Sequence, residues 1–441
     1  MFATEPSDRR VVVTGLGVIS PIGNDTQLFW QALVEGRSGI SQPTSSERDG
    51  GSAPSAGAVR DFGEGIEDFG PLDKPVRKAI RKALRLMNRE TQMAVATAQK
   101  ALAESGLNSA RFDPERVGVC FGSGNAAVMP EDFLPGIEAC TDEANQFDAA
   151  RWGTDGLPQV APLWLLTCLS NMPSCRIAIF NDLQGPNNSI TQREASANLA
   201  VGEAVNMIAD DEADAMVVGG TGTTMLPFNR LHEILDREVA VDGPDPSALC
   251  RPFDRRRSGS VLGEGAAAVV LEELESALRR GVPIYGEVTG IGASCVVDRG
   301  GVPHRDAALS NSIRSALRRA DRSPDSIGHV QAHGLSTRLC DRDEARAIRD
   351  IFGERAGSLP VAAAKSGLGN AGAGSGAIEL VAGLLALKHG HLFPVLNYEE
   401  PDPECPVSPV TSADVAAGRS FLNLSVSSQG QAGCVLVESL E

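Results

Sequence analysis

The sequence predicts an α/β protein, and three observations indicate this class. Short runs of β-branched residues that end in glycine alternate with longer segments of helical periodicity along the chain. One strand ending, Val-Thr-Gly-Leu-Gly at residues 13–17, has a near copy, Val-Thr-Gly-Ile-Gly, at residues 288–292. The composition favours small and aliphatic residues, with 47 glycines, 42% hydrophobic residues and only 4% aromatic residues. Such a chain can pack helices closely against strands, so we expect alternating layers of the two.

The first strand is expected over residues 10–17, where a run of valines ends in glycines, and a helix is expected over residues 26–36. The apolar runs at 117–124 and 215–220 also end in glycine and are typical of strands buried on both faces. A further strand is expected over 284–292. Longer helices are predicted at Glu90–Ser105, Ala195–Ala209, Asp306–Ala320 and Ile378–Lys388.

The repeated pentapeptide lies near the start of each half of the chain and predicts an internal duplication. A match of only five residues could also reflect shared strand-turn chemistry. We expect an N-terminal half over residues 1–250 and a C-terminal half over residues 251–441. Ser41–Asp73, which is rich in Gly, Ser, Pro and acidic residues, is interpreted as an elaborated surface loop. Glu138–Pro158 is interpreted as an insertion without assigned chemistry.

Composition excludes several classes of protein. The net charge of −17 argues against nonspecific binding to nucleic acid. Nine cysteines without a CxxC pair indicate reduced thiols, not a disulfide framework or a zinc site. Met1–Arg10 has no apolar signal-peptide core, and Gly156–Cys175, the longest uncharged stretch, is interrupted by prolines and polar residues. We therefore expect a soluble cytoplasmic protein without a membrane span.

Several ordered motifs follow one another along the chain: Val13–Gly23, Gly185–Asn198, Arg251–Asp254, Gly263–Ala266, Ala332–Gly334 with Thr337 and Asp341, Lys365–Ser366, and Pro394–Tyr398. Together they resemble the type II β-ketoacyl-acyl-carrier-protein synthase family, over residues 10 to about 437. The resemblance implies a thiolase-like duplicated fold in a five-layer αβαβα arrangement, usually as a dimer. It implies acyl carrier protein as a partner, with the substrate carried on the phosphopantetheine of that protein and no separate cofactor or metal.

The family's condensation uses a cysteine nucleophile at a helix N-terminus, two histidines that assist loss of CO2, and a lysine and a glutamate that hold this network. His333 occupies the position of the first histidine, Lys365 that of the lysine and Glu379 that of the glutamate. The two other positions differ from the family pattern. Glu194 replaces the cysteine, and Asn370 replaces the second histidine. The family also has a gating loop rich in Gly and Phe near the C-terminus, whereas residues 423–431 contain no Phe.

Three functions remain open for this set of residues. Ordinary condensation is the least favoured, because a carboxylate is a weak nucleophile and would form a labile anhydride. Decarboxylation of malonyl-ACP is a better candidate, but Glu194 would repel the malonyl carboxylate, and Asn370 can donate a hydrogen bond without shuttling a proton. We favour a condensation-deficient, chain-length-factor-like subunit that pairs with itself or with an active synthase in fatty-acid or polyketide biosynthesis. A different reaction in the same pocket is also open, because fold does not fix function.

Two of these residues also have structural explanations. Glu194 in the first turn of a helix would be stabilised by the helix dipole by about 0.3–1 kcal/mol, with no role in a reaction. Lys365 can pair with Glu379 simply to hold two segments together.

A basic stripe recurs every three or four residues between positions 74 and 89. Acyl carrier proteins are acidic, so a positive stripe on an acidic chain could steer one to this surface. The alternative is an ordinary solvated helix face. The stripe consists of Lys74, Arg77, Lys78, Arg81, Lys82, Arg85 and Arg89.

Overall fold

The computed structural model describes residues 9–44, 54–63, 65–107, 112–124, 128–236, 238–241 and 243–440. The predictions for Met1–Arg10 and Ser41–Asp73 therefore fall in part outside the described residues. No helix in the described part of the chain is both long and apolar enough to cross a membrane.

Most strands join one large mixed sheet. The small strands β2 (Ile40–Ser41) and β3 (Ala56–Gly57) pair with each other off its main path, and β3 joins the sheet by pairing with β7 (Leu262–Glu273). The strands of the main path are β1 (Val11–Ile19), β4 (Val117–Gly122), β5 (Asn187–Ile190), β6 (Ala215–Thr223), β7 (Leu262–Glu273), β8 (Gly286–Cys295), β9 (His329–Gln331), β10 (Pro360–Ala362), β11 (Ser408–Pro409), β12 (Ser420–Val426) and β13 (Gln431–Glu438).

The order of these strands reveals the two halves of the molecule. It reads β11-β10-β9-β12-β13-β8-β1-β7-β6-β4-β5, so β1 and β8 lie side by side in the middle. Outward from β1, the first two pairings, β1–β7 and β7–β6, are antiparallel. The next two, β6–β4 and β4–β5, are parallel. Moving outward from β8, the same sequence of directions runs through β13, β12, β9 and β10. This correspondence supports the duplication that the pentapeptide predicted.

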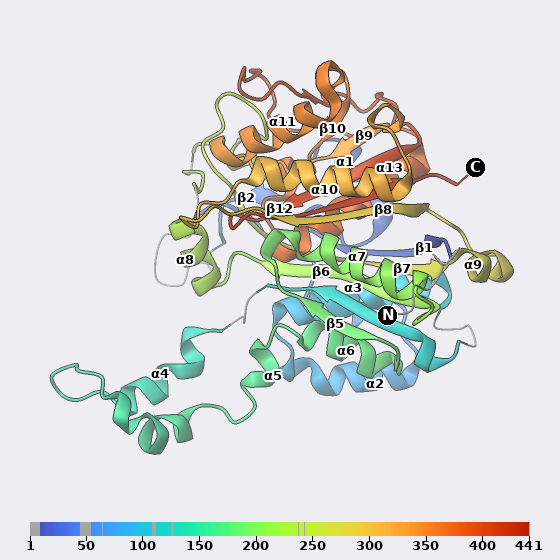
Figure 1. The fold of residues 1–441 in the computed structure, drawn as a ribbon. Coiled ribbons are helices and arrows are strands. Elements are labelled where there is room, and N and C mark those ends of the chain that lie inside the picture. The colour runs from blue at the N-terminus through green and yellow to red at the C-terminus, as the bar shows by residue number, and fades with distance from the viewer. Residues whose placement is uncertain are drawn as a thin grey trace.

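The strands of the two halves form two layers, which meet where β1 pairs with β8, and helices form three more layers. Together these are the five layers that the resemblance implied (Figure 1). The outer helices of the first half pack on β4, β6 and β7, the outer helices of the second half pack on β9, β12 and β13, and α7 and α13 lie between the two groups of strands. The helices are α1 (Thr26–Val34), α2 (Lys74–Ala83), α3 (Arg89–Ser105), α4 (Pro130–Ala139), α5 (Leu165–Cys168), α6 (Met172–Asn181), α7 (Ser196–Ala209), α8 (Pro227–Asp236), α9 (Leu274–Arg280), α10 (Arg305–Ala320), α11 (Arg338–Phe352), α12 (Lys365–Leu368) and α13 (Ser375–His389).

The repeated glycines explain why the pentapeptide occurs twice. A Cβ atom on Gly17 would lie 2.1 Å from the carbonyl oxygen of Thr97 in α3, and one on Gly292 would lie 1.9 Å from the carbonyl oxygen of Ser312 in α10. Only glycine allows the strand and helix backbones to approach this closely. The same device therefore seats the outer helix of each half.

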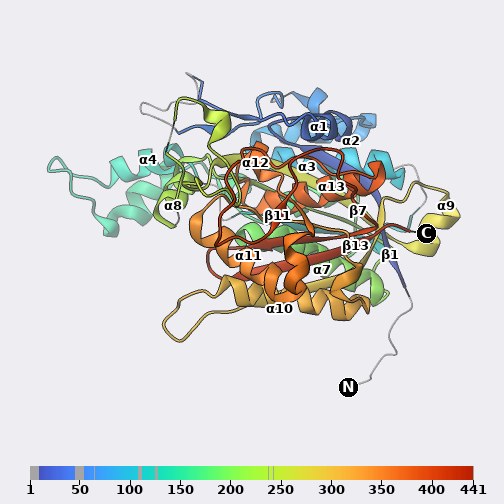
Figure 2. The same cartoon turned by 90° about the horizontal axis from the view of Figure 1, so that it is seen from above.

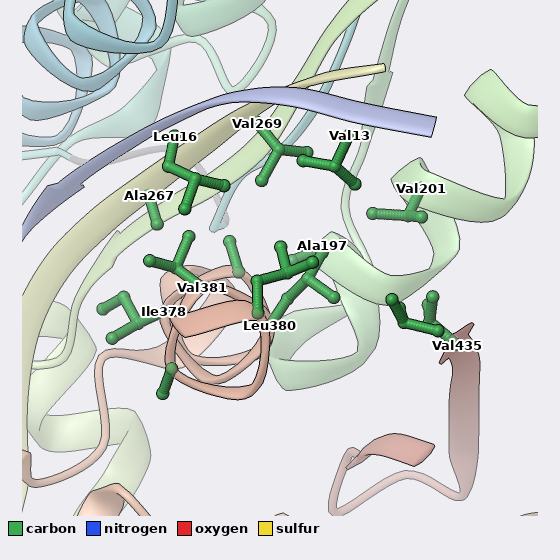
Figure 3. Close-up of a cluster of buried hydrophobic side chains, with 14 of the residues drawn as sticks. Val13, Leu16, Ala197, Val201, Ala267, Val269, Ile378, Leu380, Val381 and Val435 are labelled. Carbon is green, nitrogen blue, oxygen red and sulfur yellow. The ribbon is translucent and has the colours of Figure 1, made fainter. Parts of the chain in front are cut away.

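The central core lies around α7 and α13. Figure 3 shows Val13 and Val269 from the first sheet half, Ala197 from α7, Leu380 from α13 and Val435 from β13 in one apolar cluster. α13 is buried along nearly its whole length, as expected for a helix that is apolar on all sides. Its N-terminal end lies close to the candidate site, so the site is attached to the most buried helix of the molecule.

One prediction about loops needs correction, and a second segment proves to be part of a longer one. The described part of Ser41–Asp73 is not only a surface loop, because Phe62, Ile66 and Phe69 are buried against α3 and its neighbours. Glu138–Pro158 belongs to a longer arm that begins after β4, includes α4 and projects from the body (Figures 1 and 2). The arm has an aromatic cluster of its own, in which the ring of Phe133 lies 4.9 Å from that of Trp164.

Candidate functional site

Glu194 lies where a tight turn leads into α7. The turn spans Arg193–Ala195, and α7 starts at Ser196, whose hydroxyl accepts a hydrogen bond from the Gln192 N–H at 2.7 Å. Arg193 has a φ of +50°, which is uncommon for a residue with a side chain. This conformation turns the chain sharply, and the Glu194 side chain is only 1% exposed. The carboxylate therefore lies at the N-terminus of α7, where the helix dipole stabilises negative charge.

Asn370 contacts Glu194 directly. Its side-chain nitrogen donates to the Glu194 carboxylate at 3.1 Å and to the Glu233 carboxylate of α8 at 3.4 Å. Its side-chain oxygen accepts from the Gly372 N–H and from the Ser375 hydroxyl. Both amide hydrogens and the amide oxygen are thus engaged, and the two donors to the oxygen fix the orientation of the amide. The structure brings the two substituted positions together.

Glu233 was not predicted from the sequence. It is 7% exposed and points inward from α8, whose apolar Phe228 and Leu231 are half exposed. A carboxylate on an otherwise unremarkable helix carries no local signal, because only the tertiary fold brings it to Asn370. Two buried carboxylates thus share one amide, at the position where the motif predicts the family's second histidine.

The remaining predicted residues form a second group around Lys365. Its ammonium donates to the His333 carbonyl at 2.8 Å and lies 3.2 Å from His333 Nδ1, and it forms an ion pair with Glu379 of α13. An ammonium has three hydrogens and no acceptor, so Nδ1 must accept, and the imidazole proton lies on Nε2. The pairing of Lys365 with Glu379 that the sequence suggested is present in the structure.

A further carboxylate, Glu344 of α11, fixes the backbone at His333. Its oxygens accept from the N–H groups of His333 at 2.7 Å and Gly334 at 2.8 Å. Burial raises the pKa of Glu344 to about 8. Burial also raises the pKa of Glu379 to about 7, although Lys365 acts in the opposite direction, and the charge of Glu194 adds to the increase. The last effect shows that the two groups of residues influence each other electrostatically.

A pocket of about 130 Å³ lies beside Glu194. Its walls include the carboxyl groups of Glu90, Glu194 and Glu233, together with His232 and Arg193. Burial raises the pKa of Glu90 to about 8, and its carboxyl accepts from the Thr223 N–H at 3.0 Å. Within the described ranges, no group of three or more His, Cys, Asp or Glu residues is placed to hold a metal ion. Three acidic residues therefore line this pocket beside Glu194, together with apolar residues such as Phe228 and Ala373.

The segment in place of the family's gating loop is a tight hairpin turn between β12 and β13. The Ser427 N–H donates to the Gln431 carbonyl at 2.8 Å, and Gly430 has a φ of +87°. Ser428 at the tip contacts both Arg193 and Asp236, at the end of α8. The turn is therefore attached to the residue that precedes Glu194.

The basic stripe is only partly what the spacing predicted. Lys74, Lys78, Arg81, Lys82 and Arg85 are exposed along α2 and the turn after it. Arg89 instead points into the body and donates to the Phe62 carbonyl at 2.7 Å and to Glu264 at 3.1 Å. It holds the segment before α2 against α3, so it does not belong to the stripe.

Comparisons with known proteins agree with this description. The Beta-ketoacyl synthase, N-terminal domain, matches residues 8–277, and the corresponding C-terminal domain matches residues 285–399. The "3-oxoacyl-[acyl-carrier-protein] synthase 2" of Coxiella burnetii (strain RSA 493 / Nine Mile phase I) is 35% identical over 398 residues, which cover 90% of each chain. The chain therefore belongs to the β-ketoacyl synthase family and has the thiolase-like fold.

Two solved structures are also similar. One is a type II PKS acyl-carrier protein in complex with its ketosynthase bound to the hexaketide, with a TM-score of 0.82 and 25% identity over 99% of this chain and 100% of that chain. The other is the ishigamide ketosynthase/chain length factor, with a TM-score of 0.77 and 29% identity over 98% of this chain and 100% of that chain. This chain is thus a ketosynthase homologue of fatty-acid or polyketide synthesis.

Proposed function

We propose that this chain is a condensation-deficient, chain-length-factor-like subunit that acts with an active β-ketoacyl synthase. The observation that carries the proposal is the bond between Glu194 and Asn370. The two residues that replace the nucleophile and the second histidine bind each other in the buried site. An acyl group cannot be held on Glu194 without displacing this arrangement, and a carboxylate would hold it only as a labile anhydride.

The same geometry weighs against decarboxylation. Loss of CO2 from a malonyl thioester leaves an enolate, whose oxygen needs hydrogen-bond donors close by. The Asn370 amide directs both hydrogens to carboxylates, and Glu194 and Glu233 would repel the malonyl carboxylate. The intact group of His333, Lys365 and Glu379 is the one observation that favours a malonyl-ACP decarboxylase, which we keep as the second candidate.

Two surface features support work with protein partners. Exposed basic side chains along α2 suit an acidic acyl carrier protein. β5 forms one edge of the sheet, and the projecting arm next to it has exposed apolar side chains, among them Leu134, Phe147 and Leu163. Such edges and patches are typical of interfaces between chains, so we propose a homodimer or a heterodimer with an active synthase.

The test is reconstitution with an intact synthase that contains the cysteine and both histidines, together with acyl carrier protein and malonyl-ACP. The proposal predicts that adding this chain changes the length of the acyl products, while the chain alone makes none. The matched control is the same mixture with the synthase cysteine replaced by alanine, which should form no product. An unchanged product distribution, with no association of the two proteins, would contradict the proposal.

A further inference from the structure

Two of the six histidines of the chain lie next to each other at the C-terminal end of α13. The helix ends at His389, and Gly390, with a φ of +78°, turns the chain so that His391 comes back beside it. The centroids of the two imidazole rings are 6.3 Å apart, and the rings are tilted by 58°. Neither histidine lines the pocket beside Glu194, so this pair is separate from the candidate site.

Trp30 of α1 holds both imidazole rings. Its ring stacks on that of His389, with 4.9 Å between centroids and 8° between planes, and lies 5.2 Å from the ring of His391. Trp30 is only 7% exposed and also meets the ring of Phe393 edge-on. Because a packed aromatic side chain has little freedom to move, the fold keeps the two imidazoles close together.

Both imidazoles favour the neutral form, which is the form that binds metal ions. His391 Nδ1 lies 3.2 Å from the Leu392 carbonyl, which can only accept, so Nδ1 carries the proton and Nε2 keeps its lone pair. Burial lowers the pKa of His389, and Lys388 and His391 act in the same direction. The Lys388 ammonium is engaged elsewhere, over the ring of Tyr285, at 4.9 Å from its centroid.

We propose that His389 and His391 bind one divalent transition-metal ion, of the group Cu²⁺, Ni²⁺ and Zn²⁺, with Trp30 as the support of both ligands. An imidazole nitrogen lies about 2 Å from such an ion, so two imidazoles that share one ion have centroids about 5–6.5 Å apart. The 6.3 Å between the two rings falls within this range. Imidazole suits these metals, whereas Mg²⁺ and Ca²⁺ take oxygen ligands.

The other coordination positions of the ion are left to water. Across the part of the chain that the structure describes, no third His, Cys, Asp or Glu joins the pair to complete a metal site. A site with two protein ligands binds its ion reversibly and leaves the ion open to a further ligand from solution. It lies outside the pocket and the motifs that carry the proposed function, and so it is independent of that function.

The test is calorimetric titration of the full-length protein with NiCl2, with the protein purified without a histidine tag. All proteins carry Cys295→Ser, which removes an exposed thiol that would compete for the metal. His389→Ala and His391→Ala are compared with His304→Ala, which removes another exposed histidine, beside Asp298. Circular dichroism without metal checks that each variant is folded.

The inference predicts saturable binding of one Ni²⁺ per chain, weakened by about tenfold or more in His389→Ala and in His391→Ala and unchanged in His304→Ala. Mg²⁺ at equal concentration should not displace Ni²⁺. Equal affinity in the parent protein and in either of the two histidine variants would overturn the inference, as would no binding up to about 1 mM Ni²⁺.

Tryptophan fluorescence locates the ion without removing a ligand. Ni²⁺ should quench the emission of the parent protein with the midpoint found by calorimetry, because Trp30 stacks directly on His389. Trp30→Phe keeps both imidazoles and an aromatic ring beneath them, so it should still bind Ni²⁺ but show much less quenching. Equal quenching with and without Trp30 would place the ion elsewhere and overturn the inference.

Discussion

The two hydrogen-bonded groups of the site differ in what they have kept from the family. The group around Lys365 retains the histidine, the lysine and the glutamate, with every ammonium hydrogen of Lys365 engaged. The group around Asn370 holds the two positions at which the motifs predict the family's nucleophile and second histidine, and its amide binds Glu194 and Glu233. The first group joins buried segments of the C-terminal half, and so it has a structural role whether or not catalysis persists. The second group holds the residues that the sequence analysis expects to depart from the family pattern, and its amide joins α7, α8 and α13.

The largest effect is expected from Lys365→Met, which breaks the retained group. It leaves the buried Glu379 carboxylate and His333 without their shared donor, and removing one partner of a buried pair costs about 3–5 kcal/mol. Urea denaturation of the full chain measures this loss in the free energy of unfolding. Lys74→Met, at an exposed position of α2, is the control and should change stability by less than about 0.5 kcal/mol. Similar values for both variants would contradict the structural role of the group.

A smaller effect is expected from Glu90→Gln, and it depends on pH. The pKa of Glu90 is raised from its ordinary value of 4.5 to about 8 by burial, so the folded protein keeps a proton that the unfolded chain releases. Glu90 therefore does not lower the free energy of unfolding below about pH 4.5. That free energy then falls as the pH rises towards 8, because the unfolded chain loses the proton that the folded protein keeps. Glutamine cannot ionise and retains the acceptor for the Thr223 N–H.

Glu90→Gln should thus gain about 3.5 kcal/mol relative to the wild type between pH 5 and pH 8, since one pKa unit corresponds to about 1.4 kcal/mol and most of the shift lies within this range. Urea denaturation of both proteins across this range provides the measurement, and Glu131→Gln at an exposed position of α4 is the control. A constant difference between wild type and Glu90→Gln would show that Glu90 is ionised in the folded protein.

Glu194→Gln tests the group around Asn370 and should have a modest stabilising effect. The amide oxygen of the substituted side chain can still accept from Asn370, while the repulsion from Glu233 and Glu379 disappears. We expect a gain of about 1 kcal/mol in the free energy of unfolding, greater at pH 8 than at pH 6 because more carboxyl groups are then ionised. A loss of stability at both pH values would mean that the Glu194 charge is needed at the N-terminus of α7.

The smallest effect concerns the basic stripe, which lies outside both groups. Reversing Arg81 and Arg85 to glutamate should weaken binding of acyl carrier protein by about three- to tenfold at low salt and leave the melting temperature nearly unchanged. Reversing Arg314 and Arg318 on α10 provides a control of equal charge change. Unchanged affinity in a titration with fluorescent carrier protein would sink the docking role of this helix.

Much of the fold could be predicted because its signals are local. The four predicted helices, α3, α7, α10 and α13, begin and end within three residues of the predicted positions. The repeated glycines of β1 and β8 mark a close approach of strand and helix that only glycine allows. The surface-loop interpretation of Ser41–Asp73 was wrong where Phe62 and Phe69 are buried, because a stretch with few periodic apolar residues can still anchor itself with single side chains.

The site was predicted only where a motif marks it. Glu194, His333, Lys365 and Asn370 were found by their place in ordered motifs, and the structure joins them in two groups. Glu233 and Glu344 could not be found in this way, because each lies on a helix that is unremarkable in sequence and meets the site only after folding. The same holds for Asp236, whose bond to Arg193 depends on how α8 packs.

The most direct test of the central claim is mass spectrometry of the wild-type chain alone, after incubation with malonyl-ACP and with an acyl-ACP. The account predicts no acyl adduct on the protein, no conversion of malonyl-ACP to acetyl-ACP and no condensed product, with Glu194→Gln as the comparison. Formation of acetyl-ACP by the wild type would establish a decarboxylase, and a stable acyl adduct would establish a nucleophile. Either result would contradict a chain-length-factor-like subunit without activity of its own.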